Sequence, residues 1–422
     1  MLLRVLLVAA GLGIAAPAIA QDYAREVAAA AALEEICRAD KGQLWGVDLC
    51  GPLIVVDPVT RGAWASRADG NGVLQQNGDF WTGTLPQGVA VANTSVEWAG
   101  VRWIMITRPL PADATELRIL VAHEAWHRVQ AGIGLAALGS DCAHLDTERG
   151  RYLLRLELRA LRRAAAARGE ARWCAARDAL AFRAARFGEF SRAAAQEAAL
   201  DRNEGLAAYT GVKLGDSDHA LDRAARILGD YDARESYTRS YAYASGPAYG
   251  LLLDGRRPRW RTELGGGAPA DLLARALGAT YSASALARTA ALYGGAAIAA
   301  EEQARAESHR VRIAQLRARF AEGPRLLLPL KAMKMEFDPN RVTPVEGLGG
   351  FYGMLILRDA WGELRATDGA LISSDFTHAV AASPDAGGLT GPGWTLKLNS
   401  DYRISQRDAM GIVRVESGPP VP

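Results

Sequence analysis

Hydrophobic residues follow a different period in successive parts of this 422-residue chain. Before Asp113, apolar and β-branched residues form short runs, such as 52–56 and 101–107, that are typical of β-strands. From Asp113 to about Glu322 the leucines recur at helical spacing. From Leu326 onward, glycine, proline and short β-branched runs return. The pattern therefore predicts an α+β fold, in which an N-terminal mixed β-sheet is followed by a mainly helical domain and a small C-terminal β domain.

The boundaries of these parts follow from composition, and the Gly323-Pro324 pair breaks the helical block. The expected segments are a leader at 1–20, an N-terminal helix and sheet at 21–112, a helical part at 113–322 and a β domain at 324–422. Helices are expected at 21–36, at 147–167 after an Asp146 N-cap, and at 170–187, 191–209 and 301–321. Strands are expected at 52–56, 89–93, 101–107, 356–357, 370–372, 394–398 and 412–415.

The first twenty residues have the features of a signal peptide. Arg4 is followed by an apolar stretch at 6–16, and Ala18-Ile19-Ala20 is a small-x-small cleavage site before Gln21. We therefore expect an exported, periplasmic or secreted protein. The alternative is an uncleaved membrane anchor, although the stretch is short and glycine-rich for a bilayer span. We expect no membrane span in the mature chain.

Export changes the interpretation of the four cysteines. An even number in an exported chain predicts two disulfides. The two most local pairings, Cys37–Cys50 and Cys142–Cys174, are favoured, and four free buried thiols are the alternative. Since none has the C-x-x-C spacing of a thiolate zinc site, the cysteines are structural in both interpretations.

The charge balance limits the classes of partner. The chain has 49 Lys and Arg against 47 Asp and Glu, so it is nearly neutral. A nearly neutral chain argues against nucleic acid or an anionic membrane as the main partner.

Residues 123–127 read His-Glu-Ala-Trp-His, an H-E-x-x-H motif. Residues four apart share a helix face, so His123 and His127 can hold one zinc ion while Glu124 reaches a metal-bound water. Asp113 and Glu116 fit a capping box, and Gly132 and Gly134 fit a helix end, which predicts a helix of about four turns. The alternative is a chance occurrence of the motif.

A catalytic zinc site needs a third protein ligand and one open position. Glu204 is the best candidate, because its neighbours are small or apolar and an unpaired buried carboxylate would be unfavourable. Asn203 is expected to orient it. Rival ligands are His144, Asp146 and Glu157, although Asp146 is better explained as an N-cap and Glu157 as a partner of an arginine. His219, His309 and His378 are expected on the surface or in the core.

Together, H-E-x-x-H and the later Asn-Glu-Gly-Leu-Ala-Ala-Tyr stretch resemble the gluzincin metallopeptidases, the thermolysin and aminopeptidase type. The resemblance covers roughly residues 85–255 and implies a divergent zincin-like domain with Glu204 as third ligand. Tyr243-Ala-Ser-Gly246 resembles the aminopeptidase Tyr-x-x-Gly element, which implies that the Tyr243 hydroxyl steadies an oxyanion; the nearby tyrosines can instead be core residues. An edge strand at 89–94 would pair with substrate. The chain departs from the family in two ways. The gap between His127 and Glu204 is much longer than in thermolysin, and the Gly-x-Met-Glu-Asn substrate motif of the aminopeptidases is absent.

The sequence thus predicts an exported zinc-dependent metallopeptidase that uses a zinc-bound water, with Glu124 as general base and Tyr243 as oxyanion donor. The expected substrate is a peptide or protein. Two alternatives stay open: a non-catalytic binding or scaffold protein on a zincin fold, and a zinc amide hydrolase acting on a non-protein substrate such as cell-wall material.

Overall fold

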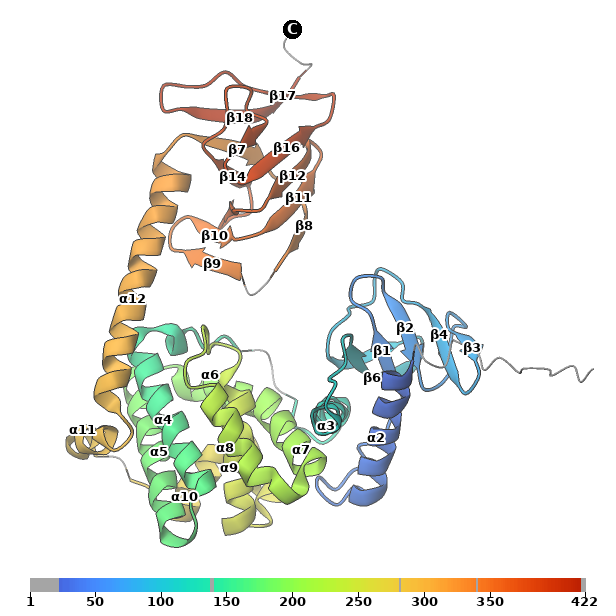
Figure 1. Cartoon of the computed structure of the whole chain (residues 1–422), viewed down its shortest axis with the longest axis vertical. Coiled ribbons are helices and arrows are strands. Elements are labelled where there is room, and N and C mark those ends of the chain that lie inside the picture. Colours follow the sequence, from blue (N-terminus) through green and yellow to red (C-terminus); the bar gives the residue numbers. More distant parts are fainter. Residues whose placement is uncertain (1–22, 137–139, 281, 339–340, 419–422) are drawn as a thin grey trace, which may run out of the picture. The chain divides into compact units, whose positions relative to one another are not determined.

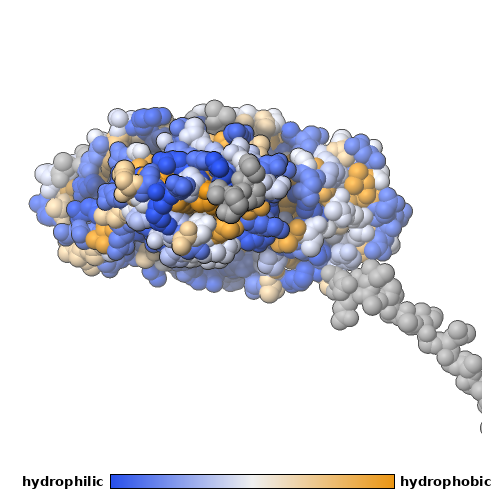
Figure 2. Space-filling view, turned by 90° about the horizontal axis from the view of Figure 1, so that it is seen from above, coloured by the Kyte–Doolittle hydropathy of each residue, from blue (hydrophilic) through white to orange (hydrophobic). Residues whose placement is uncertain are grey.

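The computed structural model describes residues 23–136, 140–280, 282–338 and 341–418. The predicted leader at 1–20 lies outside the described residues. The chain forms two compact units, 1–302 and 303–422, with an α+β composition that confirms the predicted fold class (Figure 1). Figure 2 shows hydrophobic and hydrophilic residues interspersed over the face in view, which is usual for a protein surface. Many large apolar side chains are buried in the cores of the two units.

The first unit begins with helix α2 and a six-stranded sheet. Its strands run in the order β3-β4-β2-β1-β6-β5, and β1 pairs with β6 in parallel while the other pairs are antiparallel, so the sheet is mixed as predicted. The bounds are α2 Ala24–Asp40, β1 Leu53–Val56, β2 Gly62–Ala65, β3 Gln75–Asn77, β4 Phe80–Thr84, β5 Thr94–Trp98 and β6 Val101–Thr107.

The predicted strand at 89–93 is wrong, and the edge strand β5 begins at Thr94 instead. Side-chain hydrogen bonds explain the difference. The guanidinium of Arg61 donates to the Val89 carbonyl at 2.6 Å, and the Asn93 side chain accepts from the Thr107 backbone N–H at 2.7 Å. These side chains occupy backbone groups that a strand would use in its ladder, so residues 89–93 form a loop.

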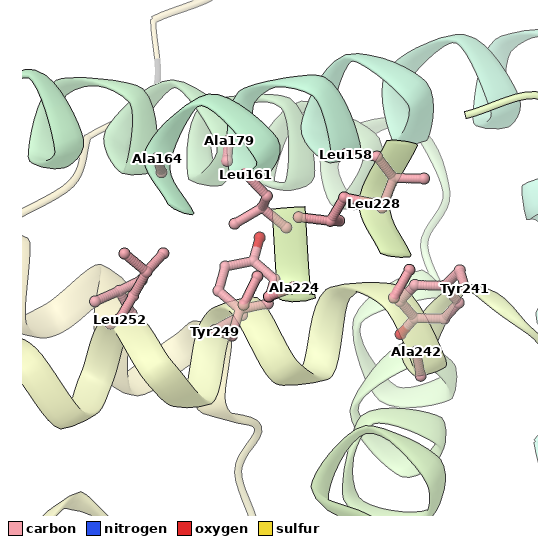
Figure 3. Packing of buried hydrophobic residues seen from close by; sticks show 14 of the residues in the cluster. Leu158, Leu161, Ala164, Ala179, Ala224, Leu228, Tyr241, Ala242, Tyr249 and Leu252 are labelled. Carbon is pink, nitrogen blue, oxygen red and sulfur yellow. The ribbon is translucent and has the colours of Figure 1, made fainter. Parts of the chain in front are cut away.

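Helices make up the rest of the first unit, with a core between α4, α5, α8 and α9 (Figure 3). In this core Tyr249 of α9 points toward Leu161 of α4, and Ala224 and Leu228 of α8 pack beside them. The bounds are α3 Ala114–Gln130, α4 Glu148–Ala166, α5 Gly169–Glu189, α6 Ala193–Leu200, a π-helical turn η2 Asp201–Gly205, α7 Leu206–Gly215, α8 Ala220–Asp230, α9 Tyr241–Arg256, α10 Pro269–Leu277 and α11 Ala283–Ala291, with short 3₁₀ turns at 143–146, 217–219 and 260–263. Helix α12, Gly295–Arg317, begins in the first unit and continues into the second.

The N-cap of α4 is Thr147 and not the predicted Asp146. The Thr147 hydroxyl accepts the Gly150 backbone N–H at 3.0 Å. Asp146 lies one residue earlier, where its carboxylate accepts the Tyr237 backbone N–H at 2.9 Å. Asp146 therefore ties the start of α4 to the segment before α9.

The cysteines form one disulfide rather than two. Cys37 and Cys50 are bonded, with Cα atoms 5.6 Å apart, as predicted. The predicted pair Cys142–Cys174 is wrong: Cys142 is a buried thiol and Cys174 an exposed one. Cys142 precedes the start of α4, whereas Cys174 lies in the second turn of α5, which follows the other end of α4, so most of the length of this 19-residue helix separates them.

The second unit begins with the later part of α12 and a π-helical turn, η5 Ala318–Glu322, which ends at the predicted Gly323-Pro324 break. The rest of this unit is mainly β structure. A seven-stranded sheet has the order β17-β18-β7-β14-β13-β10-β9 and a five-stranded sheet the order β15-β16-β12-β11-β8. The bounds are β7 Arg325–Pro329, β8 Lys334–Phe337, β9 Val342–Val345, β10 Gly349–Tyr352, β11 Leu355–Asp359, β12 Gly362–Ala366, β13 Ala370–Ser373, β14 His378–Ala382, β15 Thr390–Gly391, β16 Trp394–Leu398, β17 Tyr402–Ile404 and β18 Ile412–Ser417.

Within the described part of the chain, none of the helices combines the length and apolar character that crossing a membrane would need.

Candidate metal centre

Helix α3 carries the H-E-x-x-H motif and begins where the sequence predicts. The Asp113 carboxylate accepts the Glu116 backbone N–H at 2.9 Å, so Asp113 is the N-cap. In a capping box the Glu116 carboxylate would also accept the Asp113 backbone N–H. Here that carboxylate forms an ion pair with Arg223 instead. The apolar side of α3, including Leu117 and Val121, packs against α2 and β6.

Two glycines bring α7 very close to α3. A Cβ atom on Gly211 would lie 2.7 Å from the Ile119 carbonyl oxygen, and one on Gly215 would lie 2.7 Å from the Ile119 nitrogen. Only glycine permits such an approach of two helix backbones. Since Ile119 is one turn before His123, the close packing fixes α7, and the turn that precedes it, beside the motif.

Glu204 lies in the π-helical turn η2, directly before α7. The wider turn interrupts the single helix predicted at 191–209. Asp201 and Glu204 would share a face of an α-helix, but here Asp201 contacts the buried Arg183 whereas Glu204 faces a cavity. Gly205 in this turn meets Gly246 of α9, where any side chain would clash with the Gly205 backbone. The crossing places Glu204 beside the start of α9.

The predicted ligands meet at one point. The Nε2 atoms of His123 and His127 are 3.2 Å apart, and Glu204 Oε2 lies 3.4 Å from the first and 3.6 Å from the second. Ligand atoms about 2.0–2.1 Å from a tetrahedral zinc lie about 3.3–3.4 Å from one another. The three distances therefore match the spacing that a tetrahedral ion requires, and the N, N, O donor set suits zinc.

The electrostatics of the site also fit a cation. Glu124 Oε2 and Glu204 Oε2 are buried without a hydrogen-bond partner, an arrangement that is unfavourable unless a cation or its water satisfies them. Burial raises the pKa of Glu124, and the charges of His123 and His127 offset only part of this rise. Burial also raises the pKa of Glu204, but the nearby imidazoles of His123 and His127 outweigh it and hold this pKa well below its usual range. Glu204 is thus the ionised partner and Glu124 the more basic carboxylate.

Asn203 and Tyr243 surround the third ligand. The Asn203 amide donates to Glu204 Oε1 at 2.9 Å, which leaves Oε2 toward the histidines, in the orienting position the sequence predicts. The ring of Tyr243 stacks parallel to that of His123, with centroids 5.5 Å apart, and Tyr243 lines the same cavity as Glu204. Burial and the Glu204 carboxylate both raise the pKa of Tyr243, so the phenol stays protonated and able to donate.

The other tyrosines of this region are core residues. Tyr241 donates to Asp201 at 2.8 Å, Tyr249 to Glu157 at 2.7 Å and Tyr237 to the Tyr231 carbonyl at 2.7 Å. Tyr243 differs from these three tyrosines because it lines the cavity beside the predicted ligands. That cavity has a volume of about 420 Å³ and is lined by Asn93, Thr94, Pro111, Glu116, Ile119, Leu120, His123, Glu124, His127, Asn203, Glu204 and Tyr243.

The rival ligands lie elsewhere. His144 contacts Glu197 at 2.8 Å, and Glu157 pairs with Arg186 at 2.6 Å, which confirms the predicted arginine partner of Glu157. Together with Asp146, these residues belong to the packing around α4. Among the described residues, a second group of possible ligands is Cys37, Asp48 and Cys50, whose sulfurs are already joined in the disulfide.

Gln130 contributes to the site, although the sequence analysis does not identify it. Its Nε2 donates to the carbonyls of Leu135 at 2.9 Å and Arg202 at 3.2 Å, which forces its Oε1 toward His127 Nδ1 at 3.2 Å. His127 must then donate from Nδ1 and present the lone pair of Nε2 to the site. The signal was its position three residues after His127, which is one helix turn further along.

We expect Gln130→Met to weaken zinc binding about 10- to 100-fold, because His127 loses its orienting acceptor while the side-chain volume is kept. Gln130→Glu keeps that acceptor and should bind zinc within a few-fold of the parent, although it no longer donates to Leu135 and Arg202. Competition with a chelating indicator measures both affinities. Equal affinities in the two variants would show that the acceptor is not what matters.

Comparison of the chain with protein-family models, with curated proteins and with solved structures finds no match.

Proposed function

We propose that this chain is an exported zinc-dependent peptidase of gluzincin type. In this proposal His123, His127 and Glu204 hold the metal and Glu124 is the general base. The observation that carries it is the convergence of three ligand atoms at 3.2–3.6 Å beside a buried carboxylate oxygen that has no partner. The Cys37–Cys50 disulfide supports export, because such bonds persist mainly in oxidising compartments.

Each side chain has a distinct role in this mechanism. Zinc, when bound, supplies Lewis acidity that makes water a nucleophile near neutral pH. Glu124 accepts a proton from the attacking water and later delivers it to the leaving amine. The Tyr243 hydroxyl donates a hydrogen bond to the substrate oxygen that gains negative charge, and Asn203 keeps Glu204 oriented.

Strand β5 supports a peptide substrate. It is one of the two outer strands of the sheet, and Thr94 at its start lines the same cavity as the three ligands. An outer strand has unpaired backbone groups, with which an extended peptide can pair as an additional strand. This edge strand begins later in the chain than the one predicted at 89–94, and its first residue lines the cavity beside the motif.

Glu204→Ala is expected to lose stoichiometric zinc, because two histidines alone do not complete a tetrahedral protein site. Metal analysis of the purified, dialysed full-length protein measures this loss. Glu189→Ala is the matched control: Glu189 is an exposed carboxylate that contacts Arg149, and this variant should retain zinc. Zinc content unchanged in Glu204→Ala would remove Glu204 from the site.

The activity is tested by incubating the zinc-loaded protein with an unbiased peptide library, with and without a chelator. Cleavage that a chelator abolishes and zinc restores supports the peptidase. Stoichiometric zinc without cleavage of any peptide would contradict it and would favour the two alternatives, a scaffold protein or an amide hydrolase with a non-protein substrate.

A further inference from the structure

The cavity wall formed by α3 changes character along the helix. His123, Glu124 and His127 lie at one end, Ile119 and Leu120 follow, and the last lining residue toward the helix start is Glu116. Pro111 adds further apolar surface to the cavity lining. Glu116 and His123 are seven positions apart, which corresponds to about 10 Å along the helix at 1.5 Å per residue. A substrate group that leaves the metal end thus meets an apolar section and then a carboxylate.

The charge of the lining is one-sided. Among the described residues it includes the carboxylates of Glu116, Glu124 and Glu204 and no lysine or arginine. Glu124 and Glu204 belong to the proposed metal centre, so Glu116 is the acidic residue that this centre does not use. Its side chain is half exposed, and so can be reached by a substrate.

The neighbours of Glu116 only partly balance its charge. Arg223 contacts Glu116 Oε1, but it also contacts Asp216 Oδ2 at 2.8 Å. Asp216 in addition faces the exposed His219 at 3.3 Å, which is charged only when protonated. One arginine shared by two carboxylates leaves this end of the cavity with a negative charge near neutral pH.

We propose that the cavity selects peptides that carry a lysine or arginine side chain next to the cleaved bond, with the cationic group at Glu116. The methylene stem would lie along Ile119, Leu120 and Pro111, because long basic side chains bury their stems on apolar surface and keep the charge at a polar end. One residue of extended peptide adds roughly 3.3 Å, and the long side chain spans the remaining distance. This inference rests on the proposed function for its substrate class.

The test uses binding and cleavage separately. Two N-acetylated, fluorescently labelled peptides differ only at one residue, lysine or its uncharged analogue norleucine. Their affinities are measured by anisotropy on zinc-loaded, full-length Glu124→Gln protein, which should bind without turnover. We expect the lysine peptide to bind about tenfold more tightly, the effect of one charge-assisted hydrogen bond. Adding Glu116→Gln should bring this ratio close to one, and Glu116→Lys should reverse it, so that the norleucine peptide binds more tightly than the lysine peptide.

Glu189→Gln is the matched control and should leave the ratio unchanged, since Glu189 lies on α5 outside the cavity lining. Zinc content checks that each variant retains the site. Equal affinities for the two peptides, or a ratio that Glu116→Gln does not lower, overturns the inference. A preference for norleucine peptides with a free amino terminus over their acetylated forms, without a preference for lysine, overturns it as well. A lysine preference in binding, with no cleavage by the parent protein, supports this inference and contradicts the peptidase.

Discussion

The zinc-loaded Glu124→Gln protein is expected to keep its metal and to lose about 10²- to 10⁴-fold in kcat, the usual contribution of a general base. Glutamine has nearly the same shape as glutamate, but its amide cannot accept a proton from water. The change is informative here because Glu124 Oε2 is buried without a partner and burial raises the pKa of this carboxylate. Both properties are those of a base rather than of a structural ion pair.

Zinc content and steady-state cleavage of one peptide from the library, measured on the same preparations, separate the two effects. Glu189→Gln, the same substitution at an exposed position, should change neither quantity. If Glu124→Gln cleaves the peptide as fast as the parent, the proposed mechanism is wrong. If it loses zinc as well, Glu124 contributes to metal binding and the general-base role is not isolated by this variant.

The ligand set was predictable because it depends on local spacing. Residues four apart are neighbours on one face of a helix, so the side chains of His123 and His127 lie together once α3 forms. Asp113 marked the start of that helix. Glu204 was found by a chemical argument, that a carboxylate among small and apolar neighbours needs a partner. The structure places it at 3.4 Å and 3.6 Å from the two imidazoles.

The parts that were missed depend on contacts between elements that are distant in the sequence. The π-helical turn at Asp201–Gly205 directs Asp201 to the buried Arg183 and Glu204 to the cavity. The hydrophobic periodicity of the segment itself does not indicate this turn. Gln130 was missed for the same reason, since its role follows from the carbonyl of Arg202, 72 positions later.

Side-chain competition for the backbone explains the smaller errors. Arg61 and Asn93 removed residues 89–93 from the sheet, and Thr147 displaced Asp146 as the N-cap. The Cys142–Cys174 pair failed because a short sequence separation can still span the length of a helix. The packing of α7 against α3 did leave a signal in the sequence. Gly211 and Gly215 lie four residues apart on α7 and mark its close crossing with α3.

A buried charge cluster supports the turn that carries Glu204. Arg186 donates to Glu157 at 2.6 Å and to both oxygens of Glu197 at 2.7 Å, and its side chain is fully buried. Arg183 contacts Asp201, the first residue of η2. The cluster thereby joins α4, α5, α6 and η2 in the core of the first unit.

Arg186→Met is expected to destabilise this unit by about 3–5 kcal/mol, the largest loss of stability that we predict. Methionine keeps most of the apolar volume but leaves Glu157 and Glu197 buried with Arg183, 3.3 Å from each, as their remaining arginine. Urea unfolding of the full-length protein, followed by the far-ultraviolet circular dichroism of its helices, measures the change.

Two further variants decide whether charge burial is the cause. Arg149→Met removes an arginine from an exposed pair with Glu189, so it should reduce stability by less than about 1 kcal/mol. Arg186→Met combined with Glu157→Gln and Glu197→Gln should recover most of the lost stability, because neutral side chains no longer require a buried counter-charge. If the triple variant is as unstable as Arg186→Met alone, the loss comes from packing around residue 186. In that case η2 is held by the shape of the core, and Asp201 by its contacts with Arg183 and Tyr241.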